Sequence, residues 1–190
     1  MSTSHYDILR RVQQLTHSAH KWSGTLYRNS SVRFANETDL LTGEGSFKFG
    51  GRWNPKGIPA VYASLTPEAS MAEALANFRY YGWDIADAMP RLFVAIDASL
   101  ERVLDLTDRS IRQRLGVSMQ RILADDWRKL QHAGTISLTQ MIGQAIATVG
   151  MDGLLTPCAC DPAKTNLVWF PKNLDDNAKI VIRRADELPN

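Results

Sequence analysis

The sequence predicts a single α+β domain. Its 190 residues are the usual size of one domain and are enough to bury a hydrophobic core without staples. Hydrophobic residues make up 44% and charged residues 22% of the chain, which is typical of a globular protein. Candidate strands and helices alternate irregularly along the chain, which favours a mixed domain over regular βαβ winding.

The first third of the chain contains one clear helix and two short strands. Ile8, Leu9, Val12 and Leu15 share one side of a helix, so an amphipathic helix is predicted there. After this helix, turn-forming residues separate short apolar runs that are typical of strands. We therefore predict a helix over residues 6–15, a strand over 25–28, a polar loop over 36–45 and a strand over 59–65.

A second helix is predicted to begin directly after that strand. Thr66 is a good N-cap residue, and Pro67 suits the first helical position because its missing N–H is not needed there. The expected buried stripe consists of Met71, Leu75 and Phe78. Glu73 lies roughly 200° around the helix from Met71, among small residues, so it should face either solvent or a cleft.

The second half of the chain is predicted to alternate strands with helices. Apolar periodicity and turn signals give strands over residues 91–96, 166–170 and 179–183, with a short candidate at Leu154-Leu155. The same criteria give helices over residues 108–115, 118–130 and 135–149.

Charge and cysteine content exclude several classes of protein. A net charge of +2 is too small to predict nucleic-acid binding, and no run is apolar and long enough for a transmembrane helix. Cys158 and Cys160 are poorly spaced for a disulfide framework, and no second ligand pair supports a metal site. With no apolar signal core at the N-terminus, a cytoplasmic protein is expected.

The run from Gly50 to Ser64 is the most informative in the chain. It joins two glycines, Arg52, a Pro-Gly turn and a strand that carries Tyr62, and the next helix carries Glu73. A guanidinium can fork onto a pyrophosphate, an aromatic ring can flank a planar base, and a carboxylate can stabilise a cationic transition state. These three residue types together point to an enzyme that splits a nucleotide.

Several motifs in this order resemble the RES domain family, whose characterised members include NAD-degrading toxins of toxin–antitoxin pairs. The resemblance starts at residue 25, so the chain divides into an N-terminal helix and connection (1–24) and a RES-like catalytic domain (25–190). The motifs are Leu26-Tyr27-Arg28, Gly45-Ser46, Gly51-Arg52-Trp53-Asn54, Val61-Tyr62-Ala63-Ser64, Met71-Ala72-Glu73-Ala74-Leu75, Gly153 to Ala159 and Asn166 to Pro171.

The resemblance implies a fold, a site and partners. The fold would be similar to that of ADP-ribosyltransferase toxins, with small mixed sheets around an NAD cleft and flanking helices. The partners would be NAD, as substrate rather than cofactor, and a cognate Xre-type antitoxin. The implied catalytic residues are Arg52, Tyr62, Glu73 and Cys158, and the implied substrate-binding residues are Arg28, Ser46, Trp53 and Asn166. Cys158 stands where the family has a serine, and a thiol is the weaker hydrogen-bond donor.

Three functions fit this reading. The first is cleavage of the nicotinamide–ribose bond of NAD by water or phosphate, through an oxocarbenium-like state that Glu73 would stabilise. The second is transfer of ADP-ribose to a macromolecule, and the third is a non-catalytic NAD-binding module. Structural roles also stay open, with Arg52 in a solvated loop, Tyr62 in the core, Glu73 on the surface and Cys158 as a buried hydrophobe.

Overall fold

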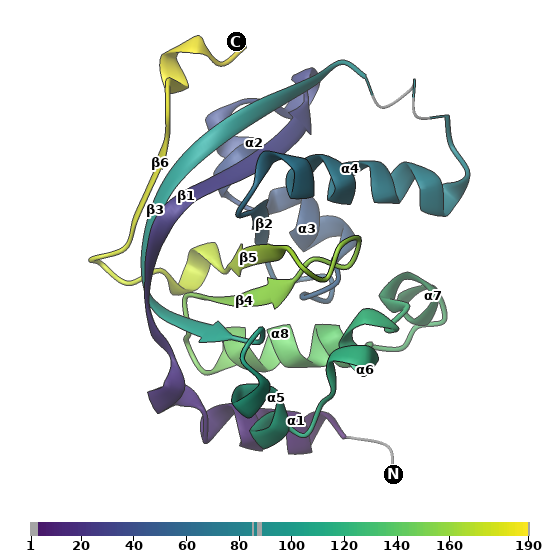
Figure 1. The fold of residues 1–190 in the computed structure, drawn as a ribbon, viewed down its shortest axis with the longest axis vertical. Helices are drawn as coiled ribbons and strands as arrows, with labels where there is room; N and C mark the ends of the chain where they lie inside the picture. Colours follow the sequence, from purple (N-terminus) through teal and green to yellow (C-terminus); the bar gives the residue numbers. More distant parts are fainter. Residues whose placement is uncertain (1–3, 85, 87–88, 190) are drawn as a thin grey trace.

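Two long antiparallel strands, β1 (His20–Ser31) and β3 (Arg91–Asp105), form the spine of the fold (Figure 1). The computed structural model describes residues 4–84, 86 and 89–189. The two strands lie side by side over most of their length, with Leu26 opposite Ile96. Both strands are much longer than the expected segments 25–28 and 91–96, because polar residues that alternate with apolar ones extend the pairing.

Within the described residues, six strands form one sheet in the order β1-β2-β5-β4-β3-β6. The shorter strands are β2 (Val61–Ser64), β4 (Gly153–Pro157), β5 (Thr165–Trp169) and β6 (Lys179–Ile182). Strands β3 and β4 pair in parallel, and the other pairs are antiparallel. Because β1 also pairs with β3, the sheet closes on itself. The α+β class is confirmed, but the expected separate small sheets are one continuous sheet.

The helices surround this sheet in two groups. Figure 1 shows α1, α5 and α8 below β4 and β5, and α4 across the upper part of the molecule. The helices are α1 (His5–Gln13), α2 (Glu37–Leu41), α3 (Glu44–Phe49), α4 (Pro67–Tyr81), α5 (Arg109–Leu115), α6 (Met119–Leu123), α7 (Trp127–His132) and α8 (Leu138–Thr148). None of the described helices is long and apolar enough to cross a bilayer.

Capping residues explain why two predictions, a loop over 36–45 and one helix over 118–130, were wrong. The segment 36–45, expected as a polar loop, holds α2 and the start of α3, because Asn36 caps α2 by accepting from Asp39 N. The expected single helix over 118–130 is two helices. Ser118 caps the first and Asp126 caps the second, so the chain turns between them.

Helix α4 begins as predicted but packs differently. The Thr66 side chain accepts from Ala69 N, and Pro67 takes the first helical position. The expected stripe of Met71, Leu75 and Phe78 is only half-buried, whereas Ala69 and Ser70 are buried. Small side chains let the helix approach β1 closely, and Ser70 accepts two hydrogen bonds from Asn29 of that strand.

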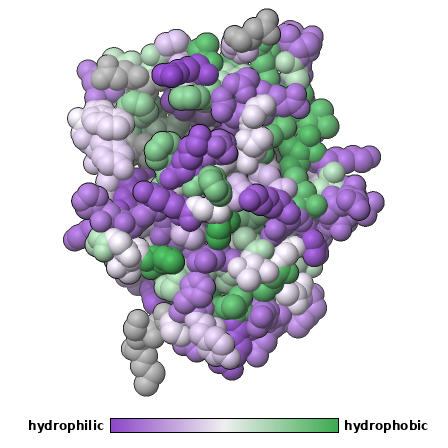
Figure 2. Space-filling model, turned by 180° about the vertical axis from the view of Figure 1, so that it is seen from behind, coloured by the Kyte–Doolittle hydropathy of each residue, from purple (hydrophilic) through white to green (hydrophobic). Residues whose placement is uncertain are grey.

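The hydrophobic core lies on both faces of the sheet. Along β4, Leu154 packs with helices α1, α5 and α8, while Leu155 faces the space enclosed by β1, β2 and β3. Along β5, Val168 joins the first cluster and Leu167 joins the second. This alternation is the period-two pattern of strands buried on both sides. Figure 2 shows the opposite face of the molecule, where hydrophilic side chains predominate and hydrophobic ones gather towards one upper edge.

Helix α8 packs closely against the turn over residues 51–54. A Cβ added at Gly143 would overlap the carbonyl oxygen of Trp53, which is backbone and cannot swing aside. One turn earlier, buried Gln140 donates from Nε2 to the carbonyl oxygen of Gly51, at 3.1 Å. Helix α8 therefore fixes the turn over residues 51–54 from behind.

We expect Gly143→Ala to destabilise the protein, because the new methyl group must push α8 away from the 51–54 turn. Overpacking of this kind typically costs about 1–3 kcal/mol, which lowers Tm by several degrees in a domain of this size. Gly45→Ala is the control, because the space around that helical glycine is open and alanine favours helices. An unchanged Tm for Gly143→Ala in thermal unfolding would contradict the close packing described.

Candidate active site

A cavity of about 530 Å³ opens between α4, β2, β5, α7 and the 51–54 turn. This volume lies in the usual range of small-molecule sites. Within the part of the chain that the structure describes, four arginines line the cavity, and Glu73 is the single carboxylate in its lining. The sequence-predicted residues that line it are Arg28, Ser46, Arg52, Trp53, Tyr62, Glu73 and Asn166. Residues from β1 to β5, more than 130 positions apart in the sequence, thus line the same cavity.

Glu73 presents one carboxylate oxygen and has the other held. Its Oε1 accepts from Cys158 Sγ at 3.1 Å, Ala159 N at 3.0 Å and Asn166 Nδ2 at 2.9 Å. Among the residues that the structure describes, Oε2 has no hydrogen-bond partner and Glu73 forms no ion pair. Helix α4 therefore delivers a carboxylate whose orientation is fixed and whose charge is available to a ligand in the cavity.

A part-buried chain of hydrogen bonds orients the amide that holds Glu73. The hydroxyl of Ser64 on β2 donates to Asn166 Oδ1 at 2.7 Å, so the amide nitrogen of Asn166 must point to Glu73. Asn166 lies opposite Ser64 in the pairing of β2 with β5. Asn166 therefore acts as a positioning residue for Glu73 as well as a lining residue.

Cys158 lies behind the cavity wall rather than on it. The residue is fully buried, and its thiol donates to Glu73 Oε1. It combines the two roles left open by the sequence, since it is a buried residue that also contacts the proposed catalytic carboxylate. The Cys160 thiol lowers the pKa of Cys158, whereas burial and Glu73 act to raise it. Cys160 itself is exposed and lines the cavity.

Tyr62 fastens the 51–54 turn to the sheet. Its hydroxyl donates to Asn54 Oδ1 at 2.6 Å and accepts from Trp53 N at 2.9 Å, and burial raises its pKa. A Cβ at position 51 would overlap this hydroxyl, so only glycine fits there. Because both roles of the hydroxyl are taken by the protein, the ring is the part of Tyr62 that remains for a ligand.

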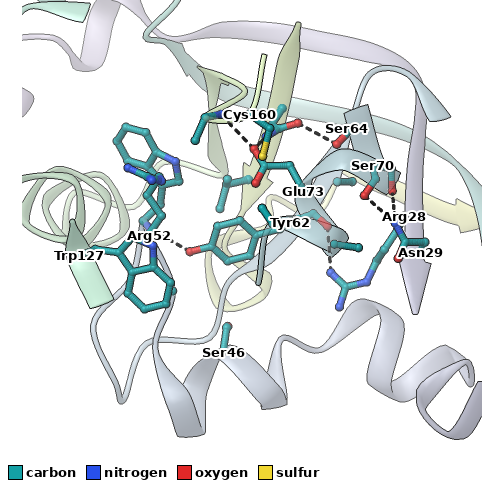
Figure 3. A pocket seen from close by; sticks show the side chains of 18 of the residues that line it. Arg28, Asn29, Ser46, Arg52, Tyr62, Ser64, Ser70, Glu73, Trp127 and Cys160 are labelled. Atoms are coloured by element: carbon teal, nitrogen blue, oxygen red, sulfur yellow. Dashed lines mark hydrogen bonds between the residues drawn. The ribbon is translucent and has the colours of Figure 1, made fainter. Parts of the chain in front are cut away.

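The Arg52 side chain is bound by backbone carbonyl groups between α6 and α7. Its Nη1 donates to the carbonyl oxygens of Ile122 and Asp125, at 3.2 and 3.0 Å. These carbonyls belong to the end of α6 and the connection to α7. The Nη1 side of the guanidinium is thus taken up by contacts within the protein. The Arg52 side chain still lines the cavity beside Trp127 (Figure 3).

Arg28 occupies the other side of Tyr62 in Figure 3. Its Nη1 donates to the carbonyl oxygen of Tyr62 at 2.9 Å, and its buried Nε has no partner among the described residues. Arg28 is therefore not among the groups that hold Glu73. Burial lowers the pKa of Arg28 to about 10, so the group is still charged at neutral pH. Arg91 lies close by, bonded through Nε to Asn29 Oδ1.

Two further predicted ligand-binding residues, Ser46 and Trp53, also stabilise the fold. The Ser46 hydroxyl contacts the carbonyl oxygens of Gly43 and Ala60 and accepts from Ala60 N, which ties α3 to the segment before β2. Trp53 is almost fully buried and belongs to the core cluster around α8. Both line the cavity, so they shape its wall from positions that packing already fixes.

Sequence reasoning missed the part of the wall that comes from α7. The Arg128 guanidinium lies over the rings of Tyr80 and Trp127, with its carbon 4.9 and 4.5 Å from their centroids. All three line the cavity. The sequence gives one signal, an aromatic–arginine pair at 127–128, but only the fold brings it to α4.

The cavity suits a planar, polyanionic ligand with a centre of developing positive charge. Arginines on both sides of Tyr62 can bind phosphate groups, aromatic rings can flank a base, and the free oxygen of Glu73 can face a cation. Glu73, Cys158 and Cys160 also place three metal-ligating atoms within 4.8 Å of one another, a cluster that the sequence did not lead us to expect.

We expect Tyr62→Phe to lower stability, because it leaves Trp53 N–H and Asn54 Oδ1 without their partner. An unsatisfied buried polar group costs about 1–3 kcal/mol. Tyr6→Phe is the matched control, since Tyr6 is 73% exposed. Thermal unfolding of both variants checks the prediction. Equal melting temperatures would mean that the hydroxyl does not hold the turn.

The known proteins that this chain is similar to include enzymes named for their action on NAD, a planar and polyanionic ligand of the kind that the cavity suits. NAD(+) phosphorylase MbcT of Mycobacterium tuberculosis (strain ATCC 25618 / H37Rv) is 34% identical over 143 residues, 73% of this chain and 69% of that protein. The probable NAD(+) phosphorylase Rv3189 of the same strain is 33% identical over 121 residues, 63% of this chain and 53% of that protein.

A solved structure matches over nearly the whole length. It is the crystal structure of the M. tuberculosis MbcT–MbcA toxin–antitoxin complex, with a TM-score of 0.72 and 25% identity, covering 96% of both chains. The family model described as RES domain matches residues 25–189. That range includes every residue named above in the cavity wall. The chain belongs to the RES domain family.

Proposed function

We propose that this protein cleaves the nicotinamide–ribose bond of NAD and transfers the ADP-ribosyl group to inorganic phosphate. The observation that carries the proposal is Glu73, whose Oε1 is anchored by three donors while Oε2 stays open in an arginine-lined cavity. The relatives named NAD(+) phosphorylase support phosphate as the acceptor. NAD is thus a substrate and not a resident cofactor.

The reaction needs no proton transfer to the leaving group. The bond between ribose C1 and the pyridinium nitrogen breaks, and its electron pair stays on nicotinamide, which leaves as a neutral molecule. A phosphate oxygen then forms the new bond to C1. The ribose passes through an oxocarbenium-like state, and a fixed carboxylate stabilises that positive charge most when it is pre-oriented. Glu73 has this arrangement, with Cys158, Ala159 and Asn166 as its supports.

Two anions must bind at once in this reaction, and the arginines form two groups. Arg52 lies near Trp127, and Arg128 stacks on the same ring. Arg28 lies on the other side of Tyr62, and Arg91 is bonded to its neighbour Asn29. We assign the pyrophosphate of NAD to the group of Arg52 and the inorganic phosphate to the group of Arg28, whose buried Nε has no partner among the residues that the structure describes.

We further propose the biological setting. The protein would be the NAD-degrading toxin of a toxin–antitoxin pair and act in the cytoplasm, with an antitoxin of Xre type as partner. The solved complex of a relative with its antitoxin supports this. Residues 25–190 would form the catalytic part, with a likeness to ADP-ribosyltransferase toxins. Residues 1–24 would support it, although β1 already begins at His20.

The direct test is incubation of purified protein with NAD, with and without phosphate, and identification of the product by mass spectrometry. The proposal predicts ADP-ribose carrying one additional phosphate on the ribose freed from nicotinamide, and a rate that rises with phosphate. Free ADP-ribose at the same rate in both samples would show a hydrolase instead. ADP-ribose found only on macromolecules of a lysate would show a transferase.

We expect Glu73→Gln to lower the rate of NAD cleavage by about 100- to 1000-fold, because the substitution keeps the size and removes the charge beside the ribosyl cation. Glu68→Gln is the matched control, as Glu68 lies on the exposed first turn of the same helix. Both variants should melt close to the parent protein. Cleavage by Glu73→Gln within a few-fold of the parent would refute the role of this carboxylate.

Cys158→Ser is expected to keep or raise NAD cleavage, because a hydroxyl is a better donor to Glu73 Oε1 than a thiol. Cys158→Ala removes the donor and should reduce kcat on the order of tenfold, or 1.4 kcal/mol. Turnover and Tm are measured together for both variants. A serine variant that loses stability and activity, with an alanine variant like the parent, would show that Cys158 serves only as an apolar core residue.

A further inference from the structure

Glu73 and Cys160, which line the cavity, and Cys158, which lies directly behind its wall, form a cluster of potential metal ligands. One ligand atom from each residue lies within 4.8 Å of the others, and Cys158 Sγ is 3.1 Å from Glu73 Oε1. Figure 3 shows Cys160 beside the Glu73 carboxylate. The carboxylate comes from α4, and both thiols come from the turn that follows β4, so the fold alone brings them together.

The spacing of these atoms suits a thiophilic divalent cation. Zinc binds thiolates at about 2.3 Å and carboxylates at about 2.0–2.2 Å in a tetrahedron, which places two sulfurs about 3.8 Å apart and a sulfur and an oxygen about 3.5 Å apart. The distance of 3.1 Å between Cys158 Sγ and Glu73 Oε1 needs to lengthen by only a few tenths of an ångström. Two sulfurs and one oxygen also favour zinc over magnesium or calcium.

We propose that Glu73, Cys158 and Cys160 bind one zinc-type cation, and that the bound ion inhibits the enzyme. On binding, the two thiols lose their protons to solvent, and the ion replaces the thiol proton between Cys158 and Glu73. Cys160 is exposed and lines the cavity, so the fourth coordination position faces the cavity, where a water molecule completes the tetrahedron.

The inhibitory effect rests on the proposed function of Glu73. A cation bound to this carboxylate neutralises the negative charge that the ribosyl transition state requires. It also places a positive charge beside the sugar carbon that becomes positive in that state. Among the described residues that line the cavity, Glu73 is the single carboxylate, so none of the others can supply that charge in its place. Toxin activity would then fall as free zinc rises.

The thiol pair makes this site particular to chains with cysteine at both positions. A serine at 158 would keep a donor for Glu73 but remove one thiolate ligand. Cysteine in place of serine at 158 therefore changes little for the orientation of Glu73 and much for the affinity for a soft metal.

Cobalt titration of the reduced protein tests the site directly. Co²⁺ bound to thiolates gives a charge-transfer absorption in the near ultraviolet, and this chain has only two cysteines, so any such band reports Cys158 or Cys160. We expect a band that saturates at one ion per chain and disappears when Zn²⁺ is added. Cys160→Ser should weaken binding by at least about 100-fold, since even indirect partners of a metal site contribute 10- to 100-fold.

Two controls separate this site from unspecific binding. His17→Gln removes an exposed potential ligand elsewhere and should leave the band and the affinity unchanged. Glu73→Gln should weaken cobalt binding and keep the fold. Absence of the band, a band of equal affinity in Cys160→Ser, or one ion shared between two chains would overturn the proposal. Zn²⁺ should also raise the Tm of the parent protein but not that of Cys160→Ser.

An activity measurement distinguishes the metal site from the proposed enzyme function. In the NAD assay, Zn²⁺ should inhibit the parent protein, a chelator should restore it, and half-inhibition of Cys160→Ser should need at least about 100-fold more zinc. Cleavage that persists when zinc fills the site would overturn the inhibitory role. A cysteine-dependent cobalt band in a protein that never cleaves NAD would support the metal site and overturn the proposed function.

Discussion

The anchoring of Glu73 Oε1 by Cys158, Ala159 N and Asn166 Nδ2 is the interaction on which the site depends. It joins the middle of α4 to β5 and the turn after β4, segments that are more than 80 residues apart in the sequence. Three donors on one oxygen fix the carboxylate in one orientation, so the other oxygen meets a ligand with little reorganisation. Such pre-orientation is where electrostatic catalysis gains most of its effect. The same convergence also creates the cluster of two thiols and a carboxylate.

The opposite wall is fixed by a second set of contacts, around the turn at residues 51–54. Tyr62 holds the turn from the sheet, and Gln140 holds it from α8. Arg52 then ties the turn to the end of α6. Because these polar groups satisfy one another, the wall is rigid and the arginine keeps its place beside the cavity. Residues that resemble a family's catalytic set thus divide into those that face the ligand and those that hold the cavity in shape.

The fold class could be predicted from sequence because helix starts and apolar periodicity are local signals, whereas the expected site residues came from the order of the motifs that resemble the RES family, and seven of the eight line the cavity. Thr66 and Pro67 mark the start of α4. The motifs from Arg28 to Asn166 contain residues that line the cavity, although they are far apart in the sequence. Strand pairing is non-local, so the length of β1 and the closure of the sheet were not foreseen. The contact between Cys158 and Glu73 and the stacking of Arg128 on Tyr80 likewise depend on tertiary packing, which no spacing rule encodes.

The central claim is that the cavity binds NAD with the nicotinamide ribose at the free oxygen of Glu73. The most direct measurement is a crystal structure of the Glu73→Gln variant soaked with NAD. The account predicts ribose C1 in contact with the side chain of residue 73, the nicotinamide against the ring of Tyr62, and the pyrophosphate on Arg52. NAD bound elsewhere, or bound in this cavity with its adenosine end at residue 73, would contradict it.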